Sequence, residues 1–324
     1  MSNAAKKRIT PLLIAIKVIL TLSLIGLLFT RIDPALVVEL WPRIDLMWAV
    51  IAIVLIAPNL YSQYRRWRVG LVRVYPALFN GDAARTMLIG LAMGALTPGR
   101  IGELGQVAFL TPGGRRRALG VIAVMRVYIV LSVLLFGAIM LFFRPDLVRM
   151  DAVAGRTMAA AILLSIVVLA VLTEYLLRTL GHPRLQQWIA RIPGIPEIFV
   201  GARELRSIDR LKFVLWSLTT SLVYLTQLVV LMLAFGAEVA WLEGVAAGAI
   251  TFGVVAVLPI TLGGIGVRES AAVLIWQQLG VPAAVAFNAA FLMFLINVII
   301  PGAIGVTWNL LRGKEFPQPE TTVP

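Results

Sequence analysis

Residues 258–270 read LPITLGGIGVRES and lie inside a long apolar stretch, residues 239–279. Three residues of this segment are glycines: Gly263, Gly264 and Gly266. Each glycine costs about 1 kcal/mol in a helix interior, so the segment interrupts any helix that enters it. Arg268 and Glu269 follow directly. In hydrocarbon, an open backbone and two charges are tolerated only where they face protein or a watery cavity, so the segment predicts a functional site.

The composition of the whole chain indicates a membrane protein. Its 324 residues are 60% apolar and only 14% charged, whereas a soluble domain carries about a quarter charged residues. Several apolar runs reach the roughly 20 residues that a helix needs to cross a bilayer. We therefore expect an all-α polytopic membrane protein.

Two further features of the composition exclude whole classes of function. The chain has no cysteine and a single histidine, His182, in a basic loop. We therefore expect no disulfide, no thiol chemistry, no metal site and no cofactor. The net charge of +13 is explained by arginines in cytoplasmic loops that touch anionic lipid, so we expect no nucleic-acid partner.

A second interrupted stretch occupies residues 82–112. Residues 83–96 are apolar but number only 14, which is short for a span and suits a segment that dips into the bilayer and returns. The sequence PGRIGE follows at residues 98–103. Arg85 and the three arginines of residues 115–117 flank the stretch, so both of its ends are expected on the cytoplasmic side. We predict a re-entrant helical hairpin with PGRIGE at its tip.

The remaining apolar runs predict about six transmembrane helices. They cover residues 11–29, 46–61, 118–143, 157–177, 213–235 and 283–311. With re-entrant hairpins at about 82–112 and 243–279, they form a single membrane domain over residues 1–312. A polar tail follows at residues 313–324. Residues 178–212 are polar with scattered apolar side chains, and we expect amphipathic pieces on the cytoplasmic surface.

The basic residues predict the orientation of this layout. Of 29 lysines and arginines, 20 fall in segments placed inside and five in segments placed outside. Four lie in or near apolar segments: Lys17, Arg100, Arg126 and Arg268. The bias predicts that both termini are cytoplasmic. Two full spans in place of each hairpin would give the same loop sides, so charge alone leaves that alternative open.

Other polar residues in the apolar runs are given structural roles. Lys17 is expected to snorkel to the interface. The arginines and aromatic residues of residues 64–73 have the composition of an interface anchor. Hydrogen bonds between helices are expected from four side chains: Glu174, Gln227, Asn288 and Asn297.

The two predicted tips resemble one another. GRIG at residues 99–102 matches GGIG at residues 263–266 at an offset of 164, and FGA at 136–138 matches PGA at 301–303 at an offset of 165. The first hairpin is predicted to enter from inside and the second from outside. We therefore expect an inverted repeat, as in transporters whose broken helices carry the substrate site. Chance matching of glycines in an apolar chain is the alternative.

Charged residues at the tips suggest a pocket for an anionic group such as a lipid phosphate. They are Arg100, Glu103, Arg268 and Glu269. A guanidinium can donate to two phosphate oxygens at once, and backbone donors at the tips would add to it. Hinges are expected at Pro98, Gly99, Gly102, Gly263, Gly264 and Gly266. Alternatively, the four charges pair among themselves and hold the tips together. Arg126 either snorkels or completes the pocket.

At these residues the chain resembles a known family. LTPGRIGELGQVAFL at 96–110 and LPITLGGIGVRESAAVLIWQQLGVPAAVA at 258–286 are similar to the flippase-like membrane family named after lysylphosphatidylglycerol synthase. That family includes the N-terminal membrane half of the multiple peptide resistance factors. The resemblance covers about residues 10–312 and implies movement of an anionic, aminoacylated or polyprenyl-linked lipid between leaflets. The sequence ends at Pro324 without a soluble aminoacyl-transferase domain, so we expect that it does not make lysylphosphatidylglycerol.

We therefore expect a lipid flippase of the bacterial inner membrane that is not an enzyme and has no catalytic residues. Its substrate would be held by Arg100, Glu103, Arg126, Arg268 and Glu269. The sequence has no ATP-binding loop, so we expect the drive to come from a gradient or from consumption of the lipid, with Glu103 or Glu269 as a proton carrier. The alternatives are an intramembrane lipid-modifying enzyme whose paired carboxylates act as acid and base, or a scaffold for a lipid-biosynthesis enzyme bound at residues 178–212.

Overall fold

In the described part of the chain the regular elements are helices, and five of the helical segments there are long and apolar enough to cross a membrane. The computed structural model describes residues 19, 22, 23, 26, 28–30, 32–97, 99–179, 194–258 and 260–312. The five candidate spans are Leu46–Val74, Pro112–Phe143, Ala152–Thr179, Ser207–Ala234 and Ala283–Arg312. They match the last five of the six predicted runs. The chain is therefore an α-helical, multi-pass membrane protein.

Several predictions fall outside the described residues. They concern most of the first run at residues 11–29, with Lys17 in it, the hinge residue Pro98, the single histidine His182, the middle of the amphipathic segment at residues 180–193, and the tail at residues 313–324.

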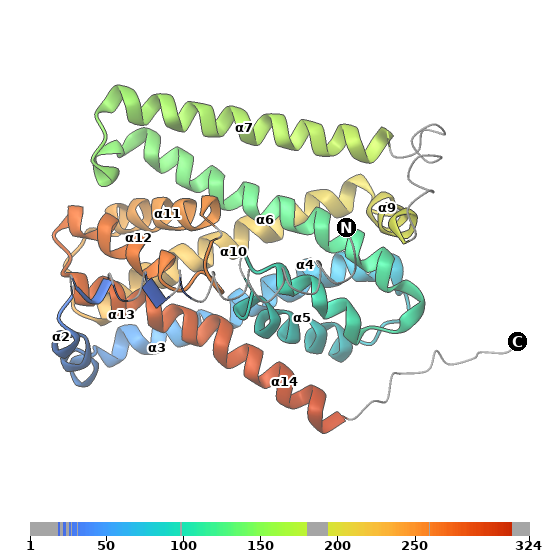
Figure 1. The fold of residues 1–324 in the computed structure, drawn as a ribbon, viewed down its shortest axis with the longest axis horizontal. Coiled ribbons are helices and arrows are strands. Elements are labelled where there is room, and N and C mark those ends of the chain that lie inside the picture. Colours follow the sequence, from blue (N-terminus) through green and yellow to red (C-terminus); the bar gives the residue numbers. More distant parts are fainter. Residues whose placement is uncertain are drawn as a thin grey trace, which may run out of the picture.

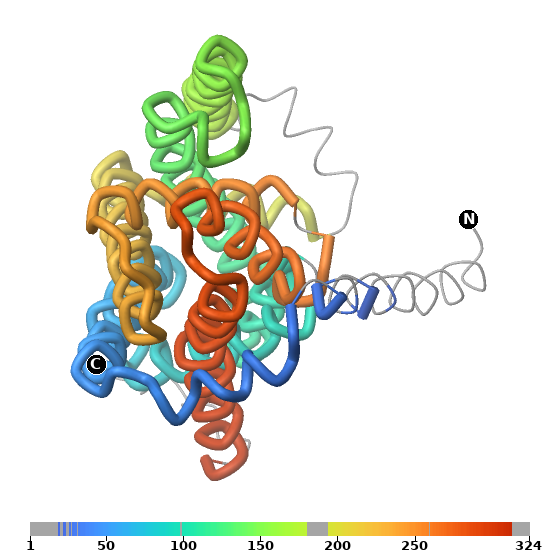
Figure 2. The backbone as a smooth tube through the Cα atoms, turned by 90° about the vertical axis from the view of Figure 1, so that its left-hand side faces the viewer, coloured from blue at the N-terminus to red at the C-terminus, as the bar shows by residue number. Residues whose placement is uncertain are grey.

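The spans pack as a bundle whose long axis is horizontal in Figure 1. They are α3 (Leu46–Val54) with α4 (Ile56–Val74), α6 (Arg115–Phe143), α7 (Ala152–Thr179), α10 (Ser207–Ala234), and α13 (Ala283–Phe294) continued by η6 (Leu295–Ile299) and α14 (Ile300–Arg312). Helix α10 contacts α3, α4, α6, α11 and α13. Seen from the end, α7 stands apart on the far side of α6 (Figure 2). Its most apolar 18 residues include none that is buried, so α7 is expected to face lipid.

Two helical hairpins complete the bundle. The first consists of α5 (Asn80–Ala95) and the 3-10 helix η2 (Ile101–Phe109), and the second of α11 (Trp241–Val257), α12 (Val267–Trp276) and η5 (Gln277–Leu279). The α5 hairpin lies toward one end of the bundle and the α11–α12 hairpin toward the other, with their turns in the middle (Figure 1). Short elements connect the rest: α2 (Pro34–Glu39), η1 (Trp41–Arg43), η3 (Pro112–Gly114), η4 (Pro145–Val148) and α9 (Ile195–Arg203).

Prolines explain two irregular points in the spans. Pro58 lacks the N–H that would bond to Val54, and its ring would clash with that carbonyl, so α3 ends at Val54 and a new helix begins at Ile56. Pro301 likewise lacks the N–H that would bond to the carbonyl of Asn297, four residues earlier. There the chain stays helical but widens into the π-helix η6.

The second span is longer than the sequence predicted, and one expectation about it was wrong for two of the residues concerned. Residues 64–73 were expected to form an interface anchor, but α4 continues to Val74 and buries Arg66 and Trp67, which are 7% and 1% exposed. The physical reason is helical periodicity, since Asn59, Gln63 and Arg66 share one face of α4 and that face packs on α10.

The polar residues within the spans join neighbouring helices, as predicted. Gln227 donates to the carbonyl of Ala52, and Asn288 donates to the carbonyl of Val37. Asn297 donates to the Gln227 side chain at 2.9 Å. On α7, Glu174 forms an ion pair with Arg210 of α10 at 3.0 Å.

Candidate functional site

The two hairpin turns touch one another in the middle of the bundle. The N–H of Gly263 donates to the carbonyl of Thr97 at 3.2 Å. Gly263 has φ of +58°, and a Cβ there would come within 2.6 Å of the carbonyl oxygen of Ala95. Only glycine combines this left-handed conformation with so close an approach. The contact therefore depends on the residue type at position 263.

Other predicted hinge glycines also occupy the tips. Gly99, Gly264 and Gly266 have positive φ angles. Gly102 lies so close to the carbonyl of Met93 that a Cβ would meet it at 2.1 Å, and its N–H donates to the Thr97 hydroxyl. Pro98 lies outside the described residues.

The first tip is held by an ion-pair network that reaches α6. Glu103 accepts from Arg126 at 2.5 Å through one carboxylate oxygen, and its other oxygen lies 2.6 Å from the Nε of Arg100. Arg126 also donates to the carbonyls of Gly99 and Arg100 at 2.9 and 3.1 Å. Of the two roles considered for Arg126, snorkelling is therefore excluded, because its guanidinium binds the tip.

Arg100 adopts a strained backbone conformation. Its φ of 56° places it in the left-handed region, which for a residue other than glycine costs about 1–3 kcal/mol. The contacts of Arg126 and Glu103 around it compensate for this strain. Such strain is concentrated at functional sites, because there the surroundings hold a residue in one geometry.

The second tip is closed by a buried carboxylate. Glu269 is 2% exposed and accepts from the N–H of Gly266 at 2.7 Å at the start of α12. It also forms an ion pair with Arg268 at 3.0 Å. The guanidinium of Arg268 lies 4.4 Å from the centre of the Phe294 ring, on which it makes a cation–π contact. The ion pairs of the first tip thus link its own residues and tie it to Arg126 of α6, and the pair of the second tip joins two neighbouring residues. Between described residues, none crosses from one tip to the other.

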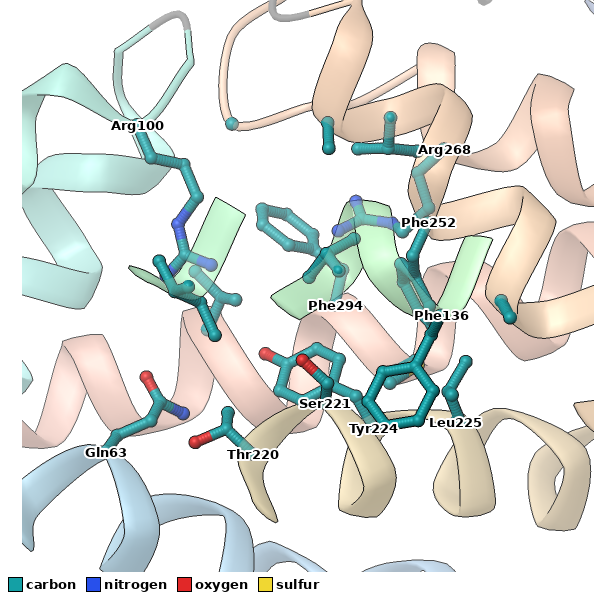
Figure 3. Close-up of a pocket in the computed structure, with 18 of the residues that line it drawn as sticks. Gln63, Arg100, Phe136, Thr220, Ser221, Tyr224, Leu225, Phe252, Arg268 and Phe294 are labelled. Atoms are coloured by element: carbon teal, nitrogen blue, oxygen red, sulfur yellow. The ribbon is translucent and has the colours of Figure 1, made fainter. Parts of the chain in front are cut away.

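Both tips border one cavity of about 200 Å³. Arg100 from the first hairpin and Arg268 from the second extend into it, with Gln63 and Thr220 near the Arg100 end (Figure 3). Apolar side chains also line it, among them Phe136, Leu225 and Phe252, which lie on the Arg268 side (Figure 3). The lining therefore combines cationic and apolar side chains, which suits an amphipathic ligand.

Arg66 also lines this cavity, and sequence reasoning missed it. Its side chain comes from α4 and lies 3.4 and 3.5 Å from the hydroxyls of Ser217 and Thr220. Within the described part of the chain, no carboxylate forms an ion pair with it. The helical spacing of the sequence could have revealed it. Asn59, Gln63 and Arg66 recur on one face of α4, and a polar face of this kind indicates contact with another helix, whereas the residues of a membrane anchor are exposed.

A chain of buried amides runs beside the cavity. Asn59 donates to Asn297 at 2.5 Å, and Gln63 donates to Asn59 at 3.0 Å. Asn297 belongs to η6 and in turn donates a hydrogen bond to Gln227 of α10. The π-helix is thus fixed by side chains on α4 and α10, directly next to cavity residues Phe294 and Val298.

The charges around the cavity do not cancel. Four arginines are present: Arg66, Arg100, Arg126 and Arg268. The carboxylates that pair with them are Glu103 and Glu269. The difference is two positive charges.

Within the described ranges, no three His, Cys, Asp or Glu side chains are grouped so that they could hold a metal ion.

A second cavity lies between α6, α7 and α11. It measures about 260 Å³ and is lined by apolar side chains and glycines, among them Gly137 and Gly253, which meet where α6 crosses α11. Its lining carries no group that could bind a headgroup.

One comparison with known proteins bears on the site. The sequence model of the family described as the lysylphosphatidylglycerol synthase TM region matches residues 14–305. The match spans both tips and all the residues that line the first cavity. A search of curated proteins finds no match.

Proposed function

Because the chain belongs to the family of lysylphosphatidylglycerol synthase transmembrane regions, we propose that it is a flippase that moves a charged lipid between the leaflets of the bacterial inner membrane. The observation that carries the proposal is the contact between Gly263 and Thr97, since it puts Arg100 and Arg268 on the same cavity. A headgroup would then have ligands from both hairpins at once. The proposed partner is a membrane lipid with an anionic group.

The arginines would bind the headgroup while the tails stay in an apolar environment. Arg100 and Arg268 offer planar donors that match the oxygens of a phosphate. The surplus of two positive charges around the cavity favours an anion over a neutral group. The apolar side chains of the lining, such as Phe136 and Phe252, would contact the first carbons of the tail.

We further propose that both hairpins are re-entrant, that they form an inverted repeat and that both termini are cytoplasmic. Helices α5 and α11 have 16 and 17 residues, so at 1.5 Å per residue each is about 25 Å long. The hydrocarbon core is about 30 Å thick, which neither helix crosses alone. Alternate opening of the two hairpins about their tip glycines would then expose the headgroup to one side at a time.

The carboxylates favour transport over catalysis in this proposal. A general acid or base must reach the substrate with a proton to exchange. Glu103 is held by two arginines, and Glu269 by Arg268 and the Gly266 N–H. We therefore propose that neither acts as a catalytic acid or base.

Reconstitution in liposomes tests the proposal against its rivals. Vesicles with the purified chain and a tail-labelled lipid are treated with an impermeant quencher, and the lipids are then analysed by mass spectrometry. Movement of unaltered lipid, lost in Arg100→Ala and retained in Arg43→Ala, is expected. Arg43 is the matched control because its ion pair with Glu39 is exposed. A new lipid species would instead indicate an enzyme, and a chain that neither moves nor alters lipid would indicate a scaffold.

A further inference from the structure

The cavity offers cations to a ligand but offers it no unengaged carboxylate. Three arginines line it, Arg66, Arg100 and Arg268, and no Asp or Glu is among the described residues of its lining. The two nearest carboxylates, Glu103 and Glu269, are already bound to arginines at both tips. An ammonium group that entered the cavity would therefore meet like charges and no counter-ion.

Arg66 is the group that most requires a ligand. It is 7% exposed, its Nε has no hydrogen-bond partner, and its Nη1 reaches only two hydroxyls at 3.4 and 3.5 Å. These distances are long for hydrogen bonds. A buried cation without a counter-ion is unfavourable unless an anion completes its surroundings. The charged groups that act on it electrostatically are Glu103, Arg100 and Arg126, so arginines outnumber acids around it.

The volume of the cavity fits a small anionic headgroup. Its volume is about 200 Å³, and an engineered protein cavity of about 150 Å³ holds one benzene molecule. A phosphate or diphosphate with the first carbons of its chain is of this size. A phosphoglycerol with an amino acid attached is considerably larger.

Resting on the proposed transport function, we propose that the site selects lipids whose headgroup is a terminal phosphate with two negative charges and rejects aminoacylated phospholipids. A terminal phosphate monoester carries between one and a half and two negative charges at neutral pH, about the same as a phosphorylated side chain. This charge matches the surplus of two positive charges at the cavity. A lysylated phosphatidylglycerol carries two ammonium groups and one phosphate, so its net charge is positive, opposite to that of the phosphate monoester.

Binding of matched ligands to the purified full chain in detergent tests the charge selection. Farnesyl phosphate, its methyl ester and farnesol share one chain and carry about two, one and no negative charges. We expect farnesyl phosphate to bind at least tenfold more tightly than the methyl ester, and lysylphosphatidylglycerol to bind more weakly than both. Comparison with short-chain phosphatidic acid shows whether a polyprenyl or a diacyl chain supplies the phosphate. Tighter binding of the methyl ester or of the lysylated lipid would overturn the proposal.

Three substitutions on α4, one of them a control, test whether the selection occurs at Arg66. Arg66→Gln should weaken farnesyl phosphate binding at least tenfold. Arg65→Gln is the matched control, because the neighbouring Arg65 is exposed and contacts Tyr61 and Trp216 outside the cavity. Gln63→Glu changes one cavity-lining amide into a carboxylate of nearly the same size, one helical turn from Arg66. It should weaken phosphate binding and strengthen binding of the lysylated lipid.

The outcomes separate this proposal from the transport function on which it rests. An unchanged preference in folded Gln63→Glu, or in folded Arg66→Gln, would show that the cavity does not set the charge of the ligand. Liposomes that move the lysylated lipid and not farnesyl phosphate would refute the charge selection and leave the flippase function standing. Liposomes in which no lipid moves would refute both.

Discussion

At the residue scale, the second tip depends on one carboxylate that serves two partners. Glu269 accepts the Gly266 N–H at the start of α12 and balances Arg268 inside the protein. A negative charge in the first turn is also favoured by the helix dipole. The same side chain therefore fixes the turn and keeps the arginine oriented toward the cavity.

Replacement of Glu269 by glutamine should destabilise the protein without removing the side chain's bulk. The amide oxygen can still accept one hydrogen bond, but Arg268, whose side chain is only 11% exposed, loses its counter-ion. We therefore expect a loss of about 1–3 kcal/mol in the free energy of unfolding. Thermal unfolding of the purified protein in detergent measures it. The control is Glu39→Gln, because the Arg43–Glu39 pair is 70% and 51% exposed, and such pairs contribute about 1 kcal/mol or less. Equal losses in the two variants would contradict this role of Glu269.

The sequence identified the charged residues at the tips but not all those at the cavity. Arg100 and Arg268 could be found because they stand within two residues of a glycine inside apolar runs, where a charge is unexpected. Arg66 stands among other arginines and aromatics, so composition placed it in an interface anchor. Only the helical register of α4, which turns Arg66 toward α10, separates it from the exposed Arg65.

At the scale of elements, the contact between the hairpins depends on how closely their backbones approach. Gly263→Ala places a methyl group against the Ala95 carbonyl, whereas a Cβ at Gly264 would meet nothing nearer than 3.8 Å. Both positions have positive φ, which costs alanine about 1–2 kcal/mol. We expect Gly263→Ala to lose about 1–3 kcal/mol more, because of the steric clash. It should also slow lipid movement more than Gly264→Ala does.

Thermal unfolding and the liposome assay on the two alanine variants, side by side, check this expectation. Similar losses at positions 263 and 264 would mean that strain in the turn, and not the approach of the two tips, sets the cost.

Broken helices were easier to predict than their detailed geometry. The turns of both hairpins fall at the glycines that the sequence singled out, because these residues disfavour helix locally. The conformation of residues 101–109 was not predictable in the same way. PGRIGE at 98–103 was expected to be the tip and the residues up to Leu110 the returning arm. The 3-10 helix η2 instead begins within the predicted tip, at Ile101, and its packing against α5 and α6 is a tertiary effect.

At the scale of the whole molecule, the proposed orientation makes a direct prediction about access from each side of the membrane. The chain has no cysteine, so single cysteines can be introduced and labelled with an impermeant maleimide. We expect Glu238→Cys to react from outside in intact cells. Gly113→Cys and Arg203→Cys should react only after the membrane is opened. All three positions are exposed in the structure.

A cysteine at a tip separates re-entrant hairpins from full spans. Ile101 is 62% exposed at the first tip. If α5 and η2 crossed the whole bilayer, Ile101→Cys would lie at the outer surface and react as readily as Glu238→Cys. In the proposed arrangement it stays unlabelled in intact cells. Reaction of Glu238→Cys from the cytoplasmic side alone would reverse the orientation proposed for the chain.

The π-helix η6 has a mechanical consequence for the last span. On one side of η6, α13 packs on α12 of the second hairpin, and on the other side, α14 packs on α5 of the first. A wide turn contains one surplus residue, and each residue of an α-helix corresponds to about 100° of rotation. If that surplus residue were taken up into the regular helix, α14 would rotate relative to α13 about the axis of the span. The same span would then turn the two hairpins in opposite directions, because each half packs on a different hairpin.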